Sequence, residues 1–148
     1  MKWVTRRNIR VNRTATAWLI RRFIDPAAAF VFVEPDQVAE VQHREGARGF
    51  DAPGATYPHI DDVGRCSFEA LVDEYHPGDA ALHALTRIVR GADFADQVGS
   101  RPESAGLRAI SHGFPLVARD DHETLEKASF LYDSLYAFLS EQKGDGRR

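Results

Sequence analysis

Cysteine is almost absent from this sequence of 148 residues, which contains only Cys66. A single cysteine excludes an intramolecular disulfide, and it excludes a four-thiolate zinc site within one copy of the chain. Long apolar runs are also missing, since the longest, residues 27–33, is far shorter than the roughly 18 residues of a membrane span. The first residues lack the apolar segment of a signal peptide. We therefore expect a cytoplasmic protein without membrane association.

Several motifs that identify common enzyme classes are missing too. The sequence has no glycine-rich dinucleotide fingerprint, Walker loop, nucleophile elbow, HExxH motif or EF-hand loop. We therefore expect neither a nucleotide nor a flavin cofactor. The composition is ordinary for a globular protein, with 43% hydrophobic and 28% charged residues, and the length fits one domain. We place this domain at residues 1–142 and expect a flexible polar tail at residues 143–148.

Basic residues, in contrast, are concentrated at the start of the chain. Residues 1–25 contain seven of the 19 Lys and Arg residues and one acid, a net charge of +6, whereas 12 basic and 21 acidic residues elsewhere give −9. Local potential guides small ions and phosphates, so we expect the N-terminal surface to attract anions. Arg21 and Arg22 lie in an otherwise apolar run, residues 18–26. They should border the core and require partners.

The distribution of apolar residues predicts an α+β fold. In the N-terminal half it predicts strands at residues 3–6 and 29–33, and helices at residues 14–24, capped by Thr14, and 35–44. A long loop follows at residues 46–64, with short strands around Phe50 and Tyr57. Helices are then expected at residues 67–75, capped by Ser67, and at 79–90, 102–110 and 120–142. We therefore predict a small sheet packed on a mainly helical C-terminal half.

The last predicted helix has two polar faces. At about 100° per residue, one face holds His122, Glu126 and Asp133. The other face holds Glu123, Lys127, Ser134 and Glu141, and Phe130 and Ala137 lie between the two faces. An amphipathic helix normally has one polar face, so we interpret the His122 face as pointing inward. Two alternatives remain open: the acids pair with Arg21 or Arg22 in a structural network, or both faces meet solvent.

His122 and Glu126 are four residues apart, so both can reach one ion from a single helix. Two ligands do not complete a site, and we take His59 and Cys66 as candidates for the others. This set predicts a divalent transition metal, zinc or iron, with Asp93 and Asp133 in supporting positions. The alternative is that each histidine is an ordinary structural residue.

Cys66 has two interpretations of its own. It lies beside Arg65 at a predicted helix start, where the helix dipole and a cation lower the pKa of a thiol. Such a thiol would be reactive. The alternative is a small buried residue that packs with its apolar neighbours.

Several blocks of the sequence resemble the chromate resistance protein family typified by the C-terminal domain of ChrB. They follow in the same order over nearly the whole chain, and the most specific are residues 18–26 (WLIRRFIDP) and 64–69 (GRCSFE). Further blocks are residues 3–6, 50–54, 88–93, 105–107, 120–122 and 132–136. The resemblance implies a role in bacterial chromate resistance, a stress response in which members accompany a chromate efflux transporter and ChrB is regarded as a chromate-responsive regulator.

The chain departs from the family pattern in two short segments. It has Asn12-Arg13 and Thr16-Ala17, where the family has Asp-Arg and Cys-Pro. A ligand or thiol role at these positions is therefore not carried over. The resemblance covers the resistance domain alone, so it does not imply the regulator's DNA-binding role.

Residue chemistry and resemblance together favour a small oxyanion such as chromate as the partner. Guanidinium groups bind tetrahedral oxyanions in bidentate fashion, and we take Arg13, Arg21, Arg22 and Arg65 as the candidate clamp. The leading hypothesis is a sensor or auxiliary protein that binds this anion, with a bound metal as an open addition. One alternative is a metal- or thiol-dependent enzyme acting on a small oxidised substrate. The other is a DNA-binding regulator, which a sequence pI near 6.1 disfavours. A homodimer also remains open.

Overall fold

Three parallel strands form the sheet in the computed structural model, which describes residues 1–145. The strands are β1 (Lys2–Arg6), β2 (Ala29–Val33) and β3 (Arg48–Gly49), and β1 lies in the centre of the order β2-β1-β3. Lys2 is paired with Ala29 and Arg6 with Val33, while Trp3 is paired with Arg48. The strands predicted at residues 3–6 and 29–33 are confirmed. The short strands predicted around Phe50 and Tyr57 are reduced to a single parallel bridge between these two residues, just after β3.

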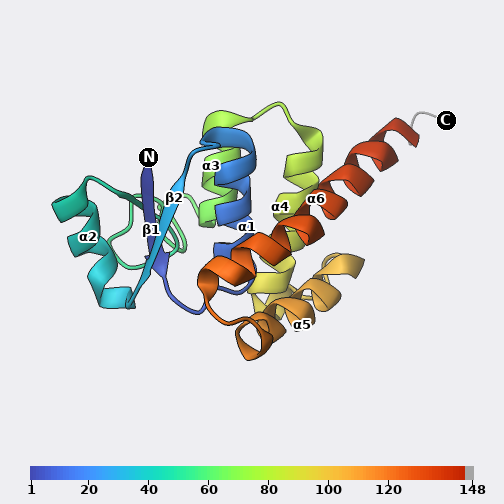
Figure 1. Cartoon of the computed structure of the whole chain (residues 1–148). Helices are drawn as coiled ribbons and strands as arrows, with labels where there is room; N and C mark the ends of the chain where they lie inside the picture. Colours follow the sequence, from blue (N-terminus) through green and yellow to red (C-terminus); the bar gives the residue numbers. More distant parts are fainter. Residues whose placement is uncertain (146–148) are drawn as a thin grey trace.

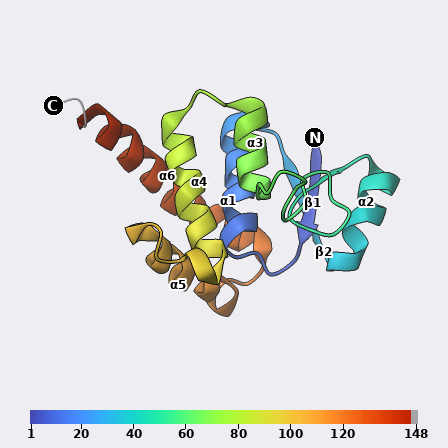
Figure 2. The ribbon, with the colours of Figure 1, turned by 180° about the vertical axis from the view of Figure 1, so that it is seen from behind.

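Alternation of side chains gives the sheet two different faces. Trp3 and Phe30 belong to the main hydrophobic core, whereas Val4 packs in a smaller cluster with Val38 and Val41. The smaller cluster is covered by α2 (Val38–Glu45), which follows a 3-10 turn at Pro35–Gln37. The other helices lie on the opposite side of the sheet, as the two views in Figure 1 and Figure 2 show. The α+β prediction is confirmed.

The helical part is built around α1 (Val11–Leu19) and α4 (Ala80–Asp93). Three further helices pack against them: α3 (Ser67–Tyr75), α5 (Pro102–Val117) and α6 (Asp121–Asp145). A π-helical turn at Ile20–Ile24 follows α1, and a 3-10 turn at Ala95–Gln97 follows α4. No helix among residues 1–145 combines the length and the apolar character needed to cross a membrane.

Helix ends differ from the prediction at several places. α1 begins three residues before Thr14, whose hydroxyl is buried without a hydrogen-bond partner among the described residues. Ser67 does not cap α3, because its hydroxyl accepts a hydrogen bond from Asn12 instead. α5 continues through Pro115 to Val117, well past Ile110. α6 runs to Asp145, and the rest of the expected tail, residues 146–148, lies outside the described residues.

Candidate functional site

A polar cavity of about 300 Å³ lies between the first turn of α1 and the end of α4. The end of β1 with the loop after it, the loop after β3 and the middle of α5 complete its lining. Arginines predominate among the side chains that line it. The lining residues are Arg6, Arg10, Val11, Asn12, Arg13, Asp51, His59, Asp93, Arg108 and His112. Four guanidinium groups therefore face two carboxylates, so the cavity has a positive excess before either histidine is protonated. We call it the arginine cavity.

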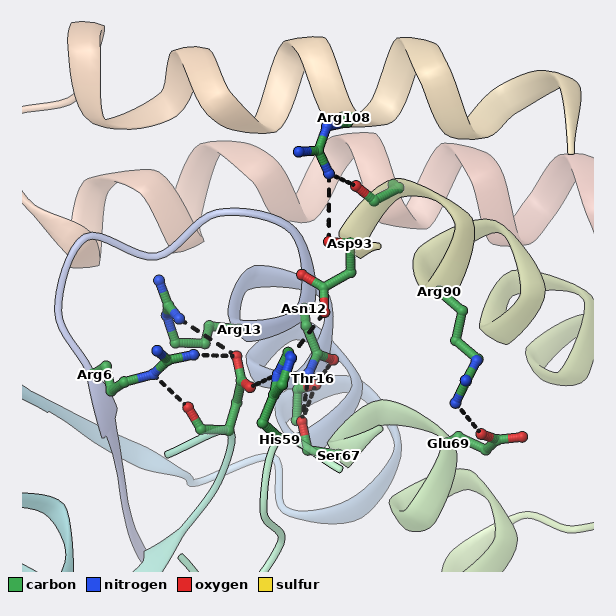
Figure 3. Close-up of polar contacts among 12 residues, drawn as sticks. Arg6, Asn12, Arg13, Thr16, His59, Ser67, Glu69, Arg90, Asp93 and Arg108 are labelled. Carbon is green, nitrogen blue, oxygen red and sulfur yellow. Dashed lines mark hydrogen bonds and ion pairs between the residues drawn. The ribbon is translucent and has the colours of Figure 1, made fainter. Parts of the chain in front are cut away.

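Asp51 is the hub of this cavity (Figure 3). Its side chain is only 2% exposed. One carboxylate oxygen lies 3.3 Å from the Arg6 guanidinium and 3.4 Å from that of Arg13. The other lies 2.6 Å from His59 Nδ1. Arg6 also donates to the backbone carbonyl of Asp51 at 2.6 Å. The backbone of Asp51 is left-handed, with φ 51°, a conformation that aspartate tolerates better than most residues and that is found often at functional sites.

His59 and Asp93 extend the network from Asp51 toward α4. The hydrogen bond to Asp51 raises the pKa of His59, and the negative charges of Asp51 and Asp93 act in the same direction. Asp93 lies 4.0 Å from His59 Nδ1 at the last residue of α4. Burial raises the pKa of Asp93, and so does the nearby charge of Asp51. Both groups therefore hold protons more readily than they would in water.

Two buried polar atoms in the cavity have no hydrogen-bond partner among the described residues. They are Arg13 Nε and Asp93 Oδ2. The Arg13 side chain is 11% exposed, and burial lowers its pKa although Asp51 opposes this effect. Buried polar groups are nearly always satisfied in folded proteins. The unpartnered atoms are therefore places where a ligand or an ordered water would add a hydrogen bond.

Arg108 and His112 form the α5 side of the cavity. Arg108 donates to the carbonyl oxygens of Ala92 at 2.9 Å and Asp93 at 3.3 Å, which satisfies carbonyl groups that the end of α4 leaves free. Burial together with the positive charges of Arg10 and Arg108 lowers the pKa of His112. Helix α5 thus contributes a guanidinium group held in place by hydrogen bonds, that of Arg108, and the imidazole of His112, whose lowered pKa favours its neutral form.

A second polar network, fully buried, lies beside the cavity on α1. Thr16 donates to Asn12 Oδ1 at 3.1 Å, and Asn12 donates to the Ser67 hydroxyl at 3.0 Å (Figure 3). These bonds join α1 to the start of α3. Asn12 and Thr16, two of the three residues noted above as departures from the resembled pattern, are thus in direct contact.

Comparison with known proteins gives a family assignment. The family model described as "ChrB, C-terminal domain" matches residues 3–139. The chain belongs to this family. It is 37% identical over 142 residues to Protein ChrB of Cupriavidus metallidurans, an alignment that covers 94% of this chain and 41% of that protein. The chain thus spans less than half the length of this ChrB relative. No solved structure matches it.

Three of the site residues predicted for this ChrB-type domain lie together in the arginine cavity: Arg13, His59 and Asp93. Arg65 does not, because it pairs with Asp61 and Asp73 beside a separate cavity of about 360 Å³. Cys66 is buried in the main core, and burial raises the pKa of its thiol to about 12. This environment is the apolar alternative that the sequence analysis left open, and it opposes formation of a thiolate.

Arg21 and Arg22 lie on the π-helical turn after α1, outside the arginine cavity. The Arg21 guanidinium lies over the Phe30 ring and donates to the Ala28 carbonyl at 3.3 Å. Arg22 lies 3.5 Å from Asp133 on α6. The alternative that acids of the last helix pair with these arginines therefore holds for one pair, Asp133 with Arg22, which lies at the surface.

The inward orientation predicted for the His122 face of α6 is wrong. His122, Glu126 and Asp133 are all exposed, because the helix buries the side that carries Leu125, Tyr132 and Leu139. The His122 ring packs on Phe32 at the sheet, with ring centroids 4.9 Å apart. Among residues 1–145, no group of three or more His, Cys, Asp or Glu side chains is arranged to hold a metal ion. His59, Cys66, His122 and Glu126 are thus not gathered into one site.

Sequence reasoning did not single out Arg6, Asp51 or Arg108, which also line the cavity. A signal for two of them was present. Arg6 ends β1, and Asp51 follows β3 after Phe50. Carboxyl ends of neighbouring parallel strands meet at one edge of a sheet, where ligand sites commonly form. The contribution of Arg108 depends on how α5 packs against the end of α4, which no local pattern specifies.

Proposed function

We propose that this protein contributes to chromate resistance by binding chromate, or a related tetrahedral oxyanion, in the arginine cavity as a sensor or auxiliary factor. The observation that carries the proposal is the excess of guanidinium groups in a small, partly desolvated cavity. Arginine forks match oxyanion geometry, and charge-assisted bonds strengthen as water is excluded. Membership of the ChrB C-terminal domain family supports chromate as the first ligand to test.

The two acids in the cavity are compatible with an anionic ligand. Asp51 is paired with two guanidinium groups and with His59, so its charge is locally compensated. Asp93 has a raised pKa, and in its protonated form it would donate a hydrogen bond to an oxyanion. Arg13 would act as the central anion ligand, with Arg10 and Arg108 completing the positive rim. This set replaces the earlier clamp, of which only Arg13 is retained.

Binding to the arginine cavity is tested by calorimetric titration with sulfate and chromate. We expect Arg13→Ala to weaken binding by about tenfold or more, because a charge-assisted hydrogen bond contributes about 1.5–3 kcal/mol. The matched control is the double variant Arg21→Ala with Arg22→Ala, which removes two nearby cations that lie outside the cavity. It should bind as the wild type does. Absence of binding in the wild type, or loss only in the control, would refute the proposal.

Affinity for sulfate should rise as the pH falls from about 8 to about 6. Sulfate keeps its double charge over this range, whereas His59, with its raised pKa, gains a proton. Protonation adds positive charge to the cavity, so the protonated protein binds the anion better. His59→Gln should flatten the profile measured by calorimetry. His43→Gln is the control, because His43 is exposed on α2 far from the cavity. An equal slope in the His59 variant would contradict the assignment.

The thiol-dependent alternative is disfavoured by the burial and raised pKa of Cys66. The metal-dependent alternative stays a prediction. It is tested by elemental analysis of protein purified without chelators, followed by the same measurement on His59→Gln and His122→Ala. Because His59 and His122 lie apart, stoichiometric zinc or iron that is lost in one of the two variants and kept in the other would favour a metal site at that histidine over simple anion binding.

A further inference from the structure

The exposed face of α6 carries an apolar stripe that the rest of the described chain leaves uncovered. Phe130 is 79% exposed, and Phe138 is also exposed. Leu116 and Val117, at the end of α5, are 84% and 85% exposed. Between α5 and α6 lies a groove of about 430 Å³, lined by Phe114, Val117, Lys127, Phe130 and Ser134 among others. Large exposed apolar side chains gathered beside a groove in this way are often found at interfaces.

The order of residues along this stripe is symmetric about Ser134. Lys127, Phe130, Ser134, Phe138 and Glu141 are separated by three, four, four and three residues. At about 100° per residue, all five lie within about 40° of Ser134, and the structure shows each of them partly or largely exposed. We define these five residues as the α6 stripe.

A two-fold axis through Ser134 makes the α6 stripe complementary to itself. In an antiparallel pair of α6 helices, Phe130 faces the partner's Phe138, and Lys127 faces the partner's Glu141. Phe130 and Phe138 are equally far from Ser134 along the helix axis, and so are Lys127 and Glu141, at a rise of 1.5 Å per residue. The two-fold axis therefore brings each residue to the same height as its counterpart on the partner helix. The angular positions around the helix axis match in the same way. Ser134 is small, which lets the two helices approach closely at the axis.

We propose that two copies of this chain associate through the α6 stripe, with the helices antiparallel and Ser134 at the two-fold axis. Lys127 and Glu141 carry opposite charges, and the two-fold axis places each of them opposite the other on the partner helix. The exposed side chains of Phe130 and Phe138 lie between these two charged pairs and supply the apolar contact. Lys127 now lies 3.8 Å from Glu123 and remains largely exposed, so it is available to a second acid. An isologous interface of this kind closes as a dimer.

The C-terminal end of α6 projects beyond the other helices in both views, and α5 lies beside its first half (Figures 1 and 2). A second α6 laid along the stripe would therefore run over the groove and the exposed end of α5. Leu116 and Val117 would flank the crossing helix and enlarge the apolar contact.

Sedimentation velocity over a range of protein concentrations tests the association. We expect a dimer for the wild type and a monomer for Phe130→Asp, whose folding is checked by circular dichroism. Lys127→Glu and Glu141→Lys should each weaken the dimer by about tenfold, since each places like charges together twice in the dimer. The double variant should recover wild-type association. A monomeric wild type, or a double variant no better than the singles, would overturn the proposal.

Cysteine cross-linking tests the position of the axis. Ser134→Cys should form a disulfide with its own copy under mild oxidation, because the axis brings the two residues together. Ser140→Cys is the matched control: it is also exposed on α6 but lies off the stripe, and it should remain monomeric on a non-reducing gel. The native Cys66 is buried and should not contribute. Cross-linking of Ser140→Cys but not Ser134→Cys would reject the antiparallel arrangement.

Discussion

Asp51→Ala is expected to lower the free energy of unfolding by about 3–5 kcal/mol, because it removes the counter-charge of a buried guanidinium. Arg13 is 11% exposed and would keep its charge without Asp51, while Arg6 and His59 would lose a partner as well. The left-handed backbone adds to the loss, since alanine adopts φ 51° less readily than aspartate. The measurement is urea denaturation followed by tryptophan fluorescence.

Two variants separate the causes of that loss. Asp51→Asn keeps a side chain that accepts hydrogen bonds and tolerates the left-handed backbone, so it should be less destabilising than Asp51→Ala. Asp62→Ala removes an exposed aspartate from the same loop and should change stability by less than about 0.5 kcal/mol. If Asp51→Ala proved as mild as Asp62→Ala, Asp51 would not be the hub of the arginine cavity.

Local patterns predicted the elements whose boundaries are set by nearby residues. The strand Ala29–Val33 and the helix Ser67–Tyr75 were placed correctly from apolar content and from the residues next to them. The start of α1 was not predicted, since it depends on a distant contact. The Asp121 carboxylate accepts hydrogen bonds from the backbone N–H groups of Asn8 and Ile9, each at 2.9 Å. This contact joins the loop before α1 to the first turn of α6.

The arginine cavity was predictable in part. The concentration of basic residues pointed to the N-terminal segment, and Arg13 does line the cavity with His59 and Asp93. Arg21 and Arg22 were misplaced because the prediction continued one α-helix to Ile24. The chain instead forms a π-helical turn from Ile20, closed by a 2.7 Å hydrogen bond from Asp25 N–H to the Ile20 carbonyl. A π-helical turn has more residues per turn than an α-helix, so the side chains after Ile20 point in other directions than the α-helical period predicts.

The two polar faces of α6 show a different limit of sequence reasoning. The helical wheel correctly separated both polar faces from the buried side. It could not predict whether either polar face points toward the protein interior or toward solvent. Both are exposed, and the apolar residue between them, Phe130, is exposed with them. A phenylalanine between two solvated faces is better explained by an interface than by a cavity. The residue order that suggested an inward-facing site therefore supports the α6 stripe instead.

Trp18→Ala is expected to destabilise the fold by about 3–5 kcal/mol, the range for removing a large buried aromatic side chain. The indole is almost fully buried, and its ring centroid lies 5.6 Å from that of Phe23 and 5.7 Å from that of Tyr132. Its Nε1 donates to Asp133 at 2.9 Å. Trp18 thus joins α1 to α6 through packing and through a hydrogen bond. Urea denaturation followed by circular dichroism measures the loss.

Trp18→Phe separates the packing of the indole from its hydrogen bond. It keeps an aromatic ring but lacks the donor to Asp133, so we expect a loss of only about 1–2 kcal/mol. Sulfate affinity should be unchanged in this variant, because the cavity residues Asn12 and Arg13 come from the other end of α1. A Trp18→Ala variant as stable as Trp18→Phe would show that α1 is held in place by its remaining contacts, such as the Tyr132 hydroxyl bond to the Val11 carbonyl.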